Sequence, residues 1–192
     1  DLNKDGEINI QNEAVYGVYM PDGIATTNIN GTEYLLTANE GDAREWGEYE
    51  NTEKVEINSS ENVEVLKSDA FDGLEEGKIY LLGGRSFSIW NAETLELVYD
   101  SGDSFEQITA RCFPEYFNSD HAETELDSRS RKKGPEPESV AVMEANGTTY
   151  AVIGLERIGG FMLYDISNPG QTVYTDYLNV RAFDPDNKLP LS

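Results

Sequence analysis

Four acidic residues recur at matched positions in two copies of one sequence pattern. Residues 21–40 return, altered but without a gap, as residues 137–156, which begin 116 residues later, at Pro137 against Pro21. The matched acids are Asp22 and Glu138 near the start of each copy, and Glu40 and Glu156 at its end. Equivalent positions of a repeat architecture lie around one axis, so these carboxylates can converge. We expect them to form a metal site or, alternatively, salt bridges that tie one copy to the next.

A second candidate metal site lies at the beginning of the chain. Oxygen-bearing side chains stand at Asp1, Asn3 and Asp5, and Gly6 follows them. Alternating hard oxygen ligands followed by glycine are typical of the first half of a calcium-binding loop, so calcium is the cofactor we expect. The twelfth position is Asn12 where such loops carry a bidentate glutamate, and a surface turn rich in Asp and Gly is the alternative interpretation.

Arginines near the repeated acids offer a competing chemistry. Arg44 follows Glu40 in the same segment, and Arg157 follows Glu156 directly. Arg44, Arg85 or Arg157 could hold the charge of a phosphoryl group whose oxygen is polarised by calcium or another bound cation. A metal-dependent phosphoesterase is therefore the competing hypothesis, although the sequence contains no P-loop, Gly-x-Ser-x-Gly or His-Glu-x-x-His motif that would supply known machinery.

The polar segment 117–138 contains the single histidine and a run of basic residues. His121 beside Asp120 could form a metal or acid/base pair, while a solvated loop histidine is the common alternative. The basic residues could receive a phosphate or pair with their acidic neighbours; they are Arg129, Arg131, Lys132 and Lys133. Cys112 is the only cysteine, so no internal disulfide can form.

The composition limits the classes of partner. The 192 residues include 37 acidic and 14 basic side chains, which gives a formal net charge of −23, and 38% of the residues are hydrophobic. Such a chain can bury a core, while its charge repels nucleic acid and anionic membranes. No apolar run is long enough to span a bilayer, so we expect neither nucleic-acid binding nor direct membrane insertion.

Alternation with a period of two predicts strands along nearly the whole chain. Asn30-Gly31 and Asn146-Gly147 each lie between alternating apolar runs. Asn-Gly favours the type I′ turn of a hairpin, because both central residues of that turn take positive φ. Helical periodicity is limited to fragments such as residues 105–110. The predicted class is all-β.

The spacing of the predicted strands indicates a partial β-propeller with long acidic loop insertions. Residues 137–178 hold four short strands, which is the content of one blade. Residues 63–101 predict a second blade and residues 15–40 begin another, while the insertions lie near 41–62 and 102–136. We expect residues 1–192 to be a single segment of a larger ring, with two to three blades of four-stranded antiparallel sheet. The expected partners are then the remaining blades of a parent chain or another copy.

Six strings in order along the chain carry a family resemblance. They are residues 5–10, 37–45, 83–90, 105–109, 134–138 and 153–160. These strings resemble the bacterial exported family called choice-of-anchor I, which is related to mesenchyme-specific cell-surface glycoproteins and whose members are often labelled alkaline phosphatase. The resemblance implies an extracellular or cell-surface β-propeller. It also makes Glu138, Glu40 and Glu156 similar to the metal-facing acids of calcium-bound propeller hydrolases.

The sequence therefore predicts an exported, calcium-binding propeller segment that serves as a binding or scaffold module of a larger protein. Its ligand would be a surface partner or a phosphorylated small molecule. The chain begins at Asp1 within a loop-like stretch, which we interpret as a mature form or a piece of a longer protein.

Overall fold

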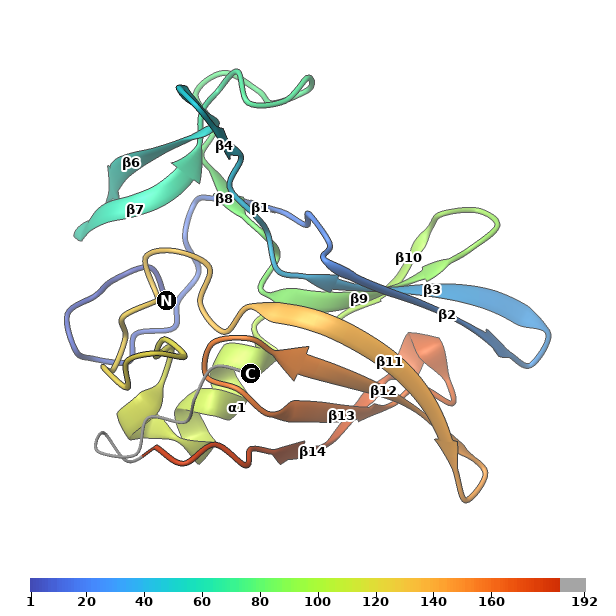
Figure 1. Ribbon diagram of the computed structural model, residues 1–192. Helices are drawn as coiled ribbons and strands as arrows, with labels where there is room; N and C mark the ends of the chain where they lie inside the picture. Colours follow the sequence, from blue (N-terminus) through green and yellow to red (C-terminus); the bar gives the residue numbers. More distant parts are fainter. Residues whose placement is uncertain (184–192) are drawn as a thin grey trace.

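The computed structural model describes residues 1–183 and contains three four-stranded sheets (Figure 1). The all-β prediction is confirmed, and the described residues contain one α-helix, α1 (Ser104–Cys112), with the 3₁₀ turns η1 (Pro114–Tyr116) and η2 (Pro169–Gln171). The helix extends the short helical fragment that the sequence indicates around Phe105.

We call the sheet of β2, β3, β9 and β10 the first sheet and the sheet of β11 to β14 the second sheet. The second sheet is an antiparallel meander in which neighbours in sequence are neighbours in space. Its strands are β11 (Pro137–Ala145), β12 (Thr148–Leu155), β13 (Phe161–Asp165) and β14 (Val173–Leu178). Four strands in this segment match the number predicted from residues 137–178. The turn between β11 and β12 has φ of 54° at Asn146 and 81° at Gly147, so the predicted type I′ hairpin is confirmed.

The first sheet is also antiparallel, but its strands come from two separated parts of the chain. It consists of β2 (Gly23–Ile29), β3 (Thr32–Asn39), β9 (Ser86–Asn91) and β10 (Leu97–Asp100), in that order. The β2–β3 turn has φ of 56° at Asn30 and 88° at Gly31, as the Asn-Gly pattern predicts. Residues 15–40 and 63–101 were expected in different blades, and the structure instead pairs β3 with β9 in one sheet.

The segment between β3 and β9 forms a third four-stranded sheet, called the side sheet, together with a short strand that precedes β2. The side sheet has the order β1 (Tyr16–Val18), β8 (Tyr80–Leu82), β7 (Ser60–Leu66) and β6 (Thr52–Ile57), with β1 and β8 parallel. A short ribbon joins β4 (Glu45–Trp46) to β5 (Tyr49–Glu50). The side sheet has a small core of its own around Val63 and Val65. The predicted insertion 41–62 is therefore largely β-structure, and the insertion 102–136 carries α1 and η1.

The main core lies between facing sides of the first and second sheets, and α1 closes it. Phe87 of β9 and Tyr164 of β13 meet with ring centroids 4.8 Å apart, and Phe105 of α1 stacks on Phe87 at 6.1 Å. All three rings are fully or almost fully buried. Burial of each large apolar side chain is worth about 1.5–3 kcal/mol, so this contact is a principal link between the sheets.

The two matched hairpins lie side by side, because β2 and β11 run along one another (Figure 1). Gly23 of β2 approaches the backbone of β11 so closely that an added Cβ would lie 2.6 Å from the carbonyl oxygen of Glu138. Only glycine permits this distance. This contact brings three segments to the same end of the two sheets: the one that follows β3, the one that follows β12 and the one that precedes β11.

Candidate functional site

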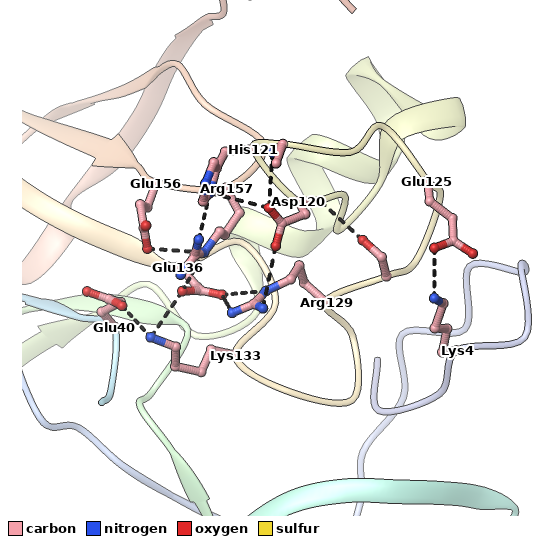
Figure 2. Close-up of polar contacts among 12 residues, drawn as sticks. Lys4, Glu40, Asp120, His121, Glu125, Arg129, Lys133, Glu136, Glu156 and Arg157 are labelled. Carbon is pink, nitrogen blue, oxygen red and sulfur yellow. Dashed lines mark hydrogen bonds and ion pairs between the residues drawn. The ribbon is translucent and has the colours of Figure 1, made fainter. Parts of the chain in front are cut away.

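Three glutamates converge where the two sheets meet. Glu40 directly follows β3, Glu156 directly follows β12, and Glu136 directly precedes β11. Carboxylate oxygens of all three lie within 4.8 Å of one another, and Figure 2 shows the three side chains around Glu136. Two of these acids, Glu40 and Glu156, are the repeat-matched pair, so the structure does bring that pair together.

Glu136 is the centre of the cluster, with no exposed surface. Arg129 binds one carboxylate oxygen through Nη2 at 2.5 Å, while Lys133 Nζ and Arg157 Nε each lie 3.0 Å from the other (Figure 2). Burial alone would raise the pKa of Glu136, but the charges of Lys133, Arg129 and Arg157 outweigh it and lower the pKa to about 2. Glu136 is therefore ionised throughout the physiological pH range.

Lys133 joins the first sheet to the second through this centre. Its ammonium lies 2.5 Å from Glu40 and 3.0 Å from Glu136, and its side chain is 13% exposed. Burial raises the pKa of Glu40, and the bond from Lys133 opposes that rise. Because Glu40 belongs to the end of β3, the ammonium is a bridge between residues of different sheets.

Glu156 lies at the edge of the cluster, and its negative charge is balanced by fewer cations than that of Glu136. Arg157 Nε lies 3.1 Å from a carboxylate oxygen of Glu156, but the same guanidinium also pairs with Glu136. Burial raises the pKa of Glu156 to about 7, against the charge of Arg157 and with added repulsion from Glu136 and Glu40. Burial therefore favours the protonated form of Glu156 up to about neutral pH.

Glu136 was not among the residues singled out from the sequence, since only its neighbour Glu138 matches the first copy. Its backbone takes a positive φ of 52°, which turns the chain before β11, and its carbonyl oxygen accepts the N–H of Glu156 at 2.9 Å. The equivalent residue of the first copy, Met20, also has positive φ, 42°. A bend of this kind redirects the side chain inward, and no period-two pattern reveals it.

The other two matched acids do not join the cluster. Glu138 is exposed and lines a hollow of about 530 Å³ together with His121, Glu156 and Phe161. Asp22 is also exposed and lines a separate hollow beside Asp42 and Arg44.

The three arginines considered for phosphate binding are not gathered in one place. Arg85 is buried, and its guanidinium donates to Glu106 at 3.1 Å and to the carbonyl oxygen of Ser130 at 2.7 Å. Arg157 is bound to Glu136 and Glu156. Arg44 is exposed and lies over the ring of Phe71, 5.1 Å from its centroid. Two of the three guanidiniums are therefore already neutralised by glutamates.

His121 and Asp120 belong to the rim of the cluster. His121 Nδ1 lies 3.3 Å from Asp120 and 2.6 Å from Nη1 of Arg157, and Asp120 lies 3.5 Å from Arg129 (Figure 2). The pair is thus tied into the ion-pair cluster. Cys112 is an exposed free cysteine at the end of α1.

The first residues form a compact loop around Asp1. Its Oδ1 accepts the N–H of Asn3 at 2.9 Å and its Oδ2 accepts the N–H of Asn9 at 2.6 Å. The side-chain amide of Asn3 donates to Asp5 at 2.6 Å. The buried carboxylate of Asp127 accepts the N–H of Asp5 at 3.0 Å and so fixes the loop to the rest of the protein.

The two candidate sites differ in how well they fit a calcium ion. In the cluster, Lys133 lies between Glu40 and Glu136, and Arg129 and Arg157 both pair with Glu136, so a divalent ion there would meet three cations. The loop has oxygen-bearing side chains at alternating positions: Asp1, Asn3 and Asp5. The ammonium of Lys4 pairs with Glu125 at 2.7 Å. The residue types of the loop are those that bind calcium, whereas the three cations of the cluster disfavour a divalent ion there.

Among residues 1–183, no helix is both long enough and apolar enough to cross a membrane.

Comparisons with known proteins agree with the family resemblance. The family model described as the choice-of-anchor I domain matches residues 1–169. Gigasin-3a of Magallana gigas is 38% identical over 103 residues, which cover 50% of this chain and 36% of the relative. The mesenchyme-specific cell surface glycoprotein of Strongylocentrotus purpuratus is 28% identical over 108 residues, 50% of this chain and 14% of the relative. The matched region thus spans about a third or less of these relatives, and no solved structure gives a significant match.

Proposed function

The chain belongs to the choice-of-anchor I domain family, and on that premise we propose that it is an extracellular or cell-surface β-propeller segment that serves as a binding or scaffold module and is stabilised by calcium. The supporting observation is the arrangement of the two main sheets. Each is a four-stranded antiparallel sheet, and their repeat-matched first strands, β2 and β11, lie next to each other. Successive propeller blades have this arrangement, in which the first strand of each blade lies nearest the axis.

The ion-pair cluster has a structural role in this proposal. It stands at the end of the seam between the two sheets and connects Glu40 of one with Glu156 and Arg157 of the other. A buried charge network with several partners per charge fixes one relative arrangement, because any displacement leaves a buried charge unpaired. The cluster therefore sets the angle between two neighbouring sheets.

The surface location draws its support from the family and from the relative in Strongylocentrotus purpuratus, which is named a cell surface glycoprotein. It is tested in the source organism by labelling intact cells with a membrane-impermeant biotin reagent. The expected result is labelling before lysis, with a cytosolic marker protein left unlabelled. Labelling that requires lysis contradicts the proposed location.

Calcium is proposed for the loop, with Asp1, Asn3 and Asp5 as ligands. The ion would neutralise the carboxylates of Asp1 and Asp5 in a strongly acidic chain. Binding to the folded state alone raises the unfolding free energy by about 2.7 kcal/mol at a calcium concentration 100-fold above the dissociation constant. Melting curves should therefore move to higher temperature with millimolar calcium and return after addition of a chelator.

Matched variants locate the ion. Asp5→Asn should abolish the calcium-dependent shift, whereas Asp69→Asn, the same change at an exposed acid elsewhere, should retain it. Glu156→Gln should also retain it. If Glu156→Gln removes the shift and Asp5→Asn does not, the ion belongs to the cluster, and if calcium moves no melting curve the calcium proposal is wrong.

Two of the three arginines that could clamp a phosphoryl group in a phosphoesterase, Arg85 and Arg157, are paired with Glu106 and Glu136, which leaves Arg44 for that role.

A further inference from the structure

The two Asn-Gly turns have the same residues in almost the same backbone conformation. Asn30-Gly31 joins β2 to β3, Asn146-Gly147 joins β11 to β12, and a threonine follows each pair. Both asparagines are exposed, with φ of 56° and 54°, and the glycines have φ of 88° and 81°. A Cβ added at either glycine would meet nothing within 4 Å. The two turns therefore form a matched pair within one chain.

An exposed asparagine that precedes a glycine can react with its own backbone. The amide nitrogen of the glycine loses its proton and attacks the side-chain carbonyl carbon of the asparagine. A bond forms between these two atoms, the bond from that carbon to the side-chain nitrogen breaks, and ammonia leaves. Water then opens the resulting succinimide ring at either of its carbonyl carbons, which gives aspartate or isoaspartate. The attack is intramolecular, and glycine permits it best because it has no Cβ to obstruct the nitrogen.

One hydrogen bond distinguishes the two turns. The N–H of Gly31 donates to Oδ1 of Asn28 at 3.0 Å. Nδ2 of Asn28 donates in turn to Oε1 of Glu33 at 2.7 Å, which fixes the Asn28 side chain beside the turn. The second copy has Glu144 at the position of Asn28. Within residues 1–183, the N–H of Gly147 donates to no acceptor, so the nitrogen that attacks is bound in the first turn and unbound in the second.

We propose that Asn146 is a site of spontaneous conversion to aspartate and isoaspartate in the folded protein, and that Asn28 protects Asn30 from the same reaction. An acceptor on the glycine N–H stabilises the protonated form of the nitrogen, so the attacking form is reached less readily. A reaction that must first break a typical hydrogen bond is slowed about fivefold. This inference goes beyond the proposed function, because it requires neither calcium nor an adjoining sheet.

Conversion at Asn146 changes the β11–β12 hairpin. Either product adds a negative charge to a chain whose net charge is already −23. Isoaspartate also adds a carbon atom to the main chain. Ala145 pairs with Thr148 directly across the turn, and a longer main chain does not fit a two-residue type I′ turn between them.

Peptide mass spectrometry of the folded protein, incubated at mildly alkaline pH, tests the proposal. Replacement of an amide by a carboxylate raises the mass of the peptide, and electron-transfer fragmentation separates aspartate from isoaspartate. In the wild type, Asn146 should convert about fivefold faster than Asn30. In concentrated urea the two rates should agree, because the turns are lost and Gly-Thr follows both asparagines.

Two variants remove and transfer the protecting side chain. Asn28 is exposed, so Asn28→Ala should remain folded by circular dichroism. It should raise the rate at Asn30 about fivefold and leave the rate at Asn146 unchanged. Glu144→Asn combined with Thr149→Glu transfers the Asn28–Glu33 pair to the second turn and should slow Asn146 to the rate of Asn30.

Equal rates at the two asparagines of the folded wild type overturn the proposal, as does an Asn28→Ala protein in which Asn30 reacts no faster. The calcium and cell-labelling experiments above do not depend on these rates, so failure here is distinguishable from failure of the proposed function.

Discussion

Replacing Glu136 by glutamine removes the central charge of the cluster and should cost about 3 kcal/mol of stability. The pKa of Glu136 is about 2 against an ordinary value of 4.5. A difference of one in pKa corresponds to about 1.4 kcal/mol, so this lowering corresponds to between about 3 and 4 kcal/mol of net stabilisation of the ionised form. Removal of one partner from a buried ion-pair network typically costs about 3–5 kcal/mol, which agrees.

The measurement is urea denaturation at pH 7, with Glu138→Gln as the control. Glu138 undergoes the same chemical change two residues away, but it is exposed, so its variant should stay within about 0.5 kcal/mol of wild type. A carboxyl whose folded-state pKa is lowered stabilises the protein above its unfolded pKa and loses that effect as pH falls through the folded one. The difference between wild type and Glu136→Gln should therefore shrink as pH falls from about 4.5 to about 2. A Glu136→Gln protein within 1 kcal/mol of wild type at pH 7 would refute the reasoning.

Three further outcomes follow from single positions. The pKa of Glu156 is raised to about 7, so the folded state binds one more proton than the unfolded state between about pH 4.5 and 7. The stability of the wild-type protein should therefore fall as the pH rises through this range. Thermal melts of Glu156→Gln should lack that fall. Gly147→Ala places a side chain at φ of 81° and should cost about 1 kcal/mol in denaturant titrations, whereas Gly170→Ala, with open space and no positive φ, should be neutral within about 0.5 kcal/mol. Gly23→Ala must push β2 away from β11 and should cost at least about 2 kcal/mol by the same titration; an unchanged midpoint contradicts the close strand contact.

The local elements were predictable because their signals are local. Asn-Gly between alternating apolar runs specifies the two hairpins through the φ values that a type I′ turn needs, and both turns have them. The four strands of the second sheet follow one another in the chain, so their order needs no long-range information.

The pairing of β3 with β9 was not predictable in the same way. More than forty residues separate the two strands, and those residues fold into the side sheet around Val63 and Val65. Alternation marks a strand but does not name its neighbour. Residues 63–66 were accordingly assigned to the same unit as β9, from which the structure separates them.

The candidate site was predictable in part. The repeat directed attention to Glu40 and Glu156, which the structure does bring together, and the salt-bridge alternative left open for them agrees with the contacts to Lys133 and Arg157. Glu136 was missed because the first copy has Met20 at that place and because a positive φ, which the sequence does not display, turns it inward.

The central claim is that charged contacts across the seam hold the two sheets in one arrangement. A double-mutant cycle between Glu40 and Lys133 tests it most directly, since Glu40 directly follows β3 and Lys133 precedes the second sheet. Unfolding free energies of Glu40→Gln, Lys133→Met and the double variant should give a coupling energy of about 1 kcal/mol or more. Additive effects, with a coupling below about 0.3 kcal/mol, would contradict the account.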